Sequence, residues 1–137
     1  MSASRLDTVR RVAVLRTTAA RAAVGAAAVR SDTAGRHLDA RTAELAGTSL
    51  VGGSAGQVQA GLAGVSRLAE AVGDAGREAD LREDERREAV AGWSAATRRA
   101  RLLDDVCARQ RAERAAHAEL RTQHLLDDLA ARARVSS

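Results

Sequence analysis

The apolar residues in the first third of the chain recur at alternating steps of three and four, which is the spacing of one face of an α-helix. One heptad position carries Leu6, Ala13, Ala20, Ala27 and Ala34, and the other carries Thr17, Val24, Leu38 and Leu45. Arg10, Ser31 and Arg41 interrupt the same seam. The pattern predicts a helix over residues 4–47, with a seam small enough for a second helix to approach closely.

Glycine and serine are concentrated in the segment GTSLVGGSAG, where the first periodicity stops, and this indicates a chain reversal over residues 48–56. A second helix is expected over about residues 57–133, with Gly73 and Gly76 as candidates for a kink. Its first part carries an apolar stripe at helical spacing, formed by Val58, Leu62, Val65, Leu68 and Val72.

The later part of the second helix has a narrower stripe, which needs a partner helix because a lone helix is marginal in water. This stripe consists of Trp93, Ala96, Ala100, Leu103 and Cys107. The chain lacks proline and has few β-branched or aromatic runs, which argues against a sheet. The predicted fold class is therefore all-α: an elongated antiparallel two-helix coiled-coil hairpin with a Gly-rich turn, forming a single domain over residues 1–137.

The two predicted helices differ in length, so part of the longer one must remain unpaired. If the two termini lie together, residues 4–47 pair with about 90–133, and the stripe from Val58 to Val72 has no partner within the chain. That stripe is then either a docking surface or folded back onto the hairpin, and the sequence leaves both alternatives open.

The composition argues against several classes of function but does not identify one. The 22 basic residues are all arginine and stand against 18 acidic ones, with alternating signs and one aromatic residue, which does not favour nucleic-acid binding. Arginines interrupt the N-terminal apolar stretch, so we expect neither a signal peptide nor a membrane span. The single Cys107 is expected to be a small buried hydrophobe, which fits a reducing cytoplasm.

No recognisable catalytic or metal-binding constellation is present in the sequence. His117 and His124 lie seven residues apart, and Glu113 precedes His117 by four, but His37 belongs to the other helix and three or four converging ligands are not supplied. A phosphate loop, a nucleophile motif and a carboxylate pair in a pocket are also lacking. The sequence therefore predicts no catalysis, no metal and no cofactor.

Motifs near both ends resemble the FliJ family, the coiled-coil component of the bacterial flagellar type III export apparatus. The second helix carries a tryptophan, a basic residue, an aliphatic residue and an Arg-Gln pair at the family's spacing, at Trp93, Arg99, Val106, Arg109 and Gln110. The closing residues from Gln123 to Ala130 read QHLLDDLA, and the opening residues from Arg5 to Val9 read RLDTV, both similar to the family's ends.

This resemblance implies a non-enzymatic stalk, similar in shape to the γ stalk of rotary ATP synthases, that binds and stimulates the flagellar export ATPase ring. It also implies contacts with the membrane export gate protein and with export chaperones, in the cytoplasm and at the membrane's inner face only through partners. The residues it assigns to the ATPase ring are Leu6, Val9, Leu126, Leu129 and Arg132. Those it assigns to the export gate are Leu62, Val65, Leu68, Ala71 and Val72. The alternative is a structural, self-associating coiled-coil adaptor with no ATPase partner.

Overall fold

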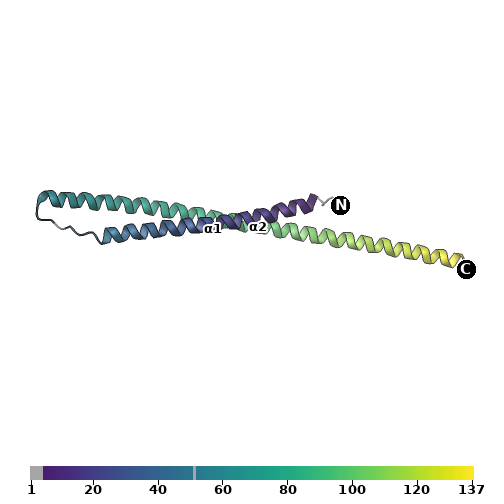
Figure 1. Cartoon of the computed structure of the whole chain (residues 1–137). Helices are drawn as coiled ribbons and strands as arrows, with labels where there is room; N and C mark the ends of the chain where they lie inside the picture. The colour runs from purple at the N-terminus through teal and green to yellow at the C-terminus, as the bar shows by residue number, and fades with distance from the viewer. Residues whose placement is uncertain (1–4, 51) are drawn as a thin grey trace. The chain divides into compact units, whose positions relative to one another are not determined.

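The computed structural model describes residues 5–50 and 52–137 and shows an all-α helical hairpin, which confirms the predicted fold class (Figure 1). Helix α1 runs over Arg5–Ala46 and helix α2 over Ala55–Val135, and the described residues include no strand. α2 continues as α-helix through Gly73 and Gly76. Each helix begins and ends within two residues of its predicted limits.

The connection between the helices is closed by local hydrogen bonds at both ends. The backbone N–H of Gly47 donates to the carbonyl of Ala43 at 2.9 Å, which ends α1. At the start of α2 the Ser54 hydroxyl accepts a bond from the backbone N–H of Gln57 at 3.2 Å. The Gln57 side chain in turn accepts bonds from the backbone N–H groups of Gly53 and Ser54. This reciprocal capping box fixes the first turn of α2.

The tertiary contacts divide the hairpin into two units, Thr17–Ala95 and the combination of Met1–Arg16 with Ala96–Ser137. In the unit Thr17–Ala95, which contains the turn, the Ser31 hydroxyl donates to Glu83 at 3.1 Å. Seven residues further along α1, Leu38 faces Gly76, where an added Cβ would lie 4.0 Å from the Leu38 Cδ1. Because seven residues forward on α1 match seven residues backward on α2, the helices in this unit are antiparallel.

The other unit has the same register. Arg10 Nε lies 2.6 Å from Asp104 Oδ1, and Leu6 lines the same shallow depression as Cys107. The expected pairing of residues 4–47 with about 90–133 is therefore wrong, because it would have placed Arg10 opposite a residue near 127. The connection explains the error, since it covers only residues 47–54 and its reach is about 30 Å. Pairing residue 47 with 90 would require it to span the length of some 35 helical residues, about 50 Å.

Only small side chains are fully buried between the helices. Among the described residues the buried apolar set is Ala13, Ala27, Ala34, Ala75 and Cys107. The other predicted seam positions of α1 are half-buried, including Arg10, Ser31 and Arg41, and this confirms the heptad pattern. Cys107 is 3% exposed, as expected for a small core residue. The core is therefore one alanine-rich layer between two helices.

α1 is long and apolar enough to cross a membrane, which differs from the expectation that the chain has no membrane span. α1 contains an 18-residue window with a mean hydropathy of 1.3, so by length and composition it meets the criteria for crossing a membrane. Arg16 and Arg21 lie in its apolar half, and its seam positions face α2. Core helices of soluble proteins meet the same criteria, so length and composition alone do not assign a location.

The seam can be tested at its most buried alanine. Ala27→Glu should lower the free energy of unfolding by roughly 1 to 3 kcal/mol, because Ala27 is 2% exposed and a carboxylate there loses its water. Ala26→Glu is the matched control, since Ala26 is exposed on the same helix. Thermal unfolding followed by circular dichroism measures both variants. Equal melting temperatures for the two would contradict the assigned seam.

Candidate partner-binding surfaces

The C-terminal part of α2 extends beyond the end of α1. Cys107 is the last buried residue of α2, and every residue from Ala108 onward is exposed (Figure 1). We call residues 111–135 the tail. From Cys107 to the end of the helix at Val135 the distance is about 42 Å at 1.5 Å per residue. Arg111 and Arg114 at its start line a shallow depression with Leu6 of α1, and beyond them the tail is a single helix exposed on all its faces.

The apolar pattern of α2 changes at the start of the tail. Continued at its own spacing past Cys107, the seam of α2 becomes polar at Gln110, Arg114, His117, Arg121, His124 and Asp128. The apolar residues instead lie one position later along the chain, which rotates them by about 100° around the helix. They form what we call the tail stripe, which consists of Ala115, Ala118, Thr122, Leu125 and Leu129. Leu125 is 64% exposed and Leu129 is 59% exposed, so the stripe is uncovered.

The five residues assigned to the ATPase ring do not come together. Leu6 is half-buried beside Cys107, and Val9 is exposed nearby. Leu126, Leu129 and Arg132 are exposed on the tail. Leu126 lies 19 residues beyond Cys107 on α2, a distance of about 28 Å. The assignment therefore separates into one site at the start of α1 and another on the tail.

The residues assigned to the export gate are mostly part of the hairpin seam. Val65, Leu68, Ala71 and Val72 are half-buried, whereas Leu62 is 53% exposed. Of the two alternatives left open by the sequence, the fold-back arrangement is therefore the one found for residues 65–72. The unpaired length of α2 lies at its C-terminal end instead.

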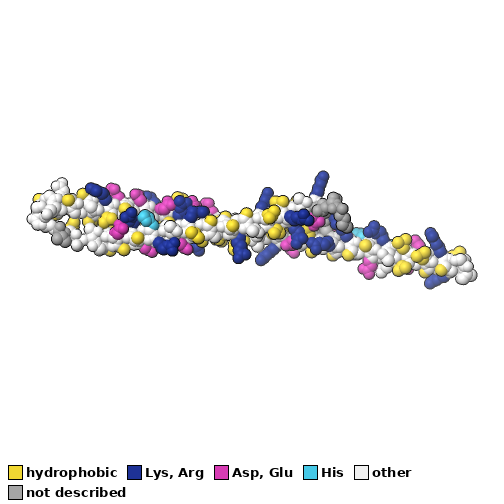
Figure 2. Space-filling model, in the orientation of Figure 1, with side chains coloured by type: hydrophobic (Ala, Val, Ile, Leu, Met, Phe, Trp, Pro, Cys, Tyr) yellow, Lys and Arg dark blue, Asp and Glu magenta, His cyan; other side chains and the backbone are white. Residues whose placement is uncertain are grey.

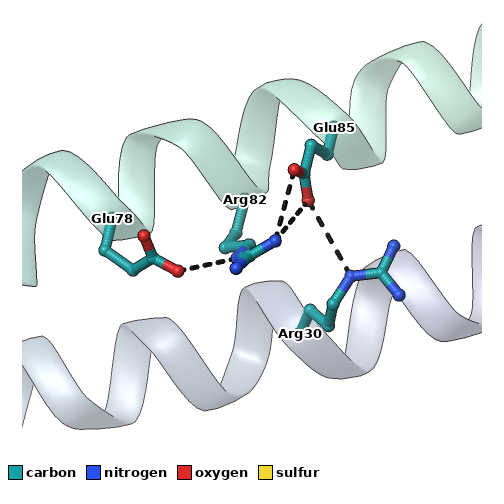
Figure 3. Close-up of polar contacts among 4 residues, drawn as sticks. All are labelled: Arg30, Glu78, Arg82 and Glu85. Carbon is teal, nitrogen blue, oxygen red and sulfur yellow. Dashed lines mark hydrogen bonds and ion pairs between the residues drawn. The ribbon is translucent and has the colours of Figure 1, made fainter.

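A polar network in the unit Thr17–Ala95 lies mostly within α2 and reaches α1 through one ion pair. Arg82 donates to Glu78 at 2.8 Å and to Glu85 at 3.0 Å, and Glu85 lies 3.8 Å from Arg30 of α1 (Figure 3). The hydrogen bonds to Glu85 and Glu78 raise the pKa of Arg82. Because exposed ion pairs stabilise a protein little, this network helps to specify the helix register more than it adds stability.

The three histidines do not lie together. His37 lines a shallow depression with Arg30, Glu78 and Arg82, and His117 and His124 are exposed on the tail. No group of three histidine, cysteine, aspartate or glutamate side chains in the described ranges is placed to hold a metal ion. Positive and negative side chains are interspersed along the visible surface, between hydrophobic and uncharged areas (Figure 2).

The sequence pointed to Leu126 and Leu129 but not to Leu125, the more exposed of the two leucines in the tail stripe. The signal was present, because the steps from Cys107 to Arg111 and from Arg111 to Ala115 are both four residues. Two successive steps of four displace a heptad pattern.

No family model, no curated protein and no solved structure matches this chain.

The fold-back of residues 65–72 gives a direct test. Leu68→Ser combined with Val72→Ser should lower the free energy of unfolding by about 1 to 3 kcal/mol, since two half-buried aliphatic side chains leave the seam. Leu62→Ser is the control, and it should change the melting temperature little because Leu62 is exposed. A double variant as stable as the parent protein would mean that residues 65–72 do not pack on α1.

Proposed function

We propose that this protein is a non-enzymatic, stalk-like component of flagellar type III protein export that binds and stimulates the export ATPase. The observation that carries the proposal is the tail, a single helix with exposed leucines that extends past the hairpin. Its sequence contains the segment from Gln123 to Ala130 that resembles the end of the FliJ family. The all-α hairpin itself agrees with the stalk that this resemblance implies.

A single helix is suited to contact inside a ring of subunits. With side chains it is about 10 to 12 Å wide, so it needs only a narrow channel. Leu126 and Leu129 would supply apolar anchors, and Arg132 would supply a charged contact at the surrounding surface. A helix with different residues on each side contacts ring subunits unequally. It can therefore favour one arrangement of the ring without contributing a catalytic group.

The export gate and the export chaperones belong to the same proposal. Leu62 and Val58 are exposed near the turn and give the gate an accessible contact at that end. Leu68, Ala71 and Val72 would become accessible only if the hairpin opened locally, because they are half-buried. The protein would act in the cytoplasm and reach the inner face of the membrane through these partners.

The alternative, a self-associating coiled-coil adaptor, is favoured by the same tail stripe, because an exposed apolar stripe at helical spacing is also what a second helix requires. The two functions differ in their partner. One predicts contact with an ATPase, and the other predicts contact with a second copy alone.

The proposal is tested by ATP hydrolysis. The purified protein should raise the hydrolysis rate of its cognate export ATPase while hydrolysing no ATP itself. Leu126→Ser with Leu129→Ser should weaken the binding that produces this effect about 100-fold or more, if both leucines are buried in the complex. Leu120→Ser is the matched control, since Leu120 is 50% exposed but lies on the opposite side of the tail from Leu129. No stimulation by the parent protein, or equal loss in both variants, would contradict the proposal.

A further inference from the structure

We propose that the tail pairs with the tail of a second copy of this chain, in antiparallel orientation, to form a homodimer. The inference starts from the tail stripe, which is exposed along its length and follows the alternation of three and four that an antiparallel coiled coil requires. An isolated helix of this length is marginal in water, so a covering helix would stabilise it. The question is which partner helix complements it.

When the tail stripes of two copies are aligned in one particular register, the side chains that lie level with each other match well in size. If Thr122 lies level with Leu125 of the second copy, then Ala118 lies level with Leu129 of the second copy. The two-fold symmetry repeats both layers. Each leucine then meets a small or medium side chain, which lets the two helices approach closely without empty space between them.

The flanking charges select the same register. In antiparallel coiled coils the residues just before the first core position of each heptad face one another across the interface. Here those residues are Arg121 and Asp128, and in this register Arg121 of each copy faces Asp128 of the other. The dimer therefore gains two symmetry-related ion pairs.

The neighbouring registers are disfavoured by the same residues. A shift of one heptad in one direction places Asp128 opposite its own symmetry mate. The shift in the other direction places Arg121 opposite Arg121 and Glu119 opposite Glu119. Like charges directly opposed across a helix interface destabilise it. The charge pattern thus favours one antiparallel alignment of two identical tails, which is why we assign a second copy as the partner.

Dimerisation and ATPase binding would use overlapping residues. Leu129 lies in the dimer core, and Leu126 lies at its edge, facing Glu119 of the second copy. The same two leucines are the anchors in the proposed contact with the ATPase. A tail engaged in the dimer is therefore not free for the ring, and the two complexes exclude each other. The dimer itself does not depend on the proposed function.

A charge exchange tests the register. Asp128→Arg turns two attractive pairs into two Arg–Arg contacts and should weaken the dimer about 10-fold or more. Arg121→Asp should do the same, and the combined variant R121D/D128R should restore the parent affinity. Arg121 and Asp128 of one chain are seven residues apart on the helix, about 10.5 Å, so a contact within the chain cannot explain the rescue. Sedimentation equilibrium of the full chain measures the dimer dissociation constant.

A leucine pair tests the face. Leu125→Ser with Leu129→Ser should make the protein monomeric, whereas Leu120→Ser should leave the dimer intact, because Leu120 lies on the opposite side of the helix. Circular dichroism checks that the hairpin remains folded in all variants. A parent protein that is monomeric at every concentration overturns the inference. A dimer that persists in L125S/L129S overturns the inference as well. So does a dimer that the charge exchange does not affect, because it would indicate parallel pairing or another face of the helix.

The dimer and the export function can be contradicted independently of each other. Sedimentation is measured without any ATPase, so a monomeric parent protein that still stimulates the ATPase removes only the dimer. A dimer without effect on the ATPase removes only the export function. D128R keeps Leu126 and Leu129, so it should weaken the dimer and leave maximal stimulation of the ATPase unchanged.

Discussion

The short connection between α1 and α2 limits how the two helices can pair. Residues 47–54 reach about 30 Å, so α2 has to turn back beside the end of α1 and cannot slide far along it. α1 has 42 residues and α2 has 81, and the excess length of α2 is therefore placed at its C-terminal end. The tail, with its exposed leucines, is a consequence of this constraint. Both the proposed contact with the ATPase and the proposed dimer use this tail.

Within that limit, the seam and its polar contacts decide the final register. Alanines at Ala13, Ala27, Ala34 and Ala75 allow close approach but bury little area, so they discriminate weakly between alignments one heptad apart. Specific pairs add the discrimination. Arg10 contacts Asp104, a hydrogen bond that raises the pKa of Arg10, and Ser31 contacts Glu83. Each such exposed contact stabilises the fold little, yet a shifted alignment would lose all of them together.

The sequence allowed the two helices, the seam of α1 and the burial of Cys107 to be predicted, because each follows from local periodicity. The pairing register does not follow from periodicity, because it is limited by the reach of residues 47–54, which is shorter than the length of helix that pairing the two termini would require. Ser54 and Gln57 also marked the start of α2 through their capping box. The partner of the tail cannot be predicted in the same way, because Leu125 and Leu129 suit any apolar helix or groove. Periodicity identifies such a surface, while only charge placement, as at Arg121 and Asp128, carries information about what covers it.

The change of phase after Cys107 separates contacts made within the chain from contacts available to other molecules. Up to Cys107 the apolar positions of α2 face α1, and beyond Arg111 they occupy a stripe rotated by about 100° from the continued seam. The positions that would continue this seam are polar, as at Arg114 and His117. Arg114 still lines a shallow depression with Leu6 of α1, and the residues that follow it are all exposed. Substitutions in the tail stripe can therefore change partner binding while leaving the packing of the hairpin intact, which makes the two roles of α2 separable along one continuous helix.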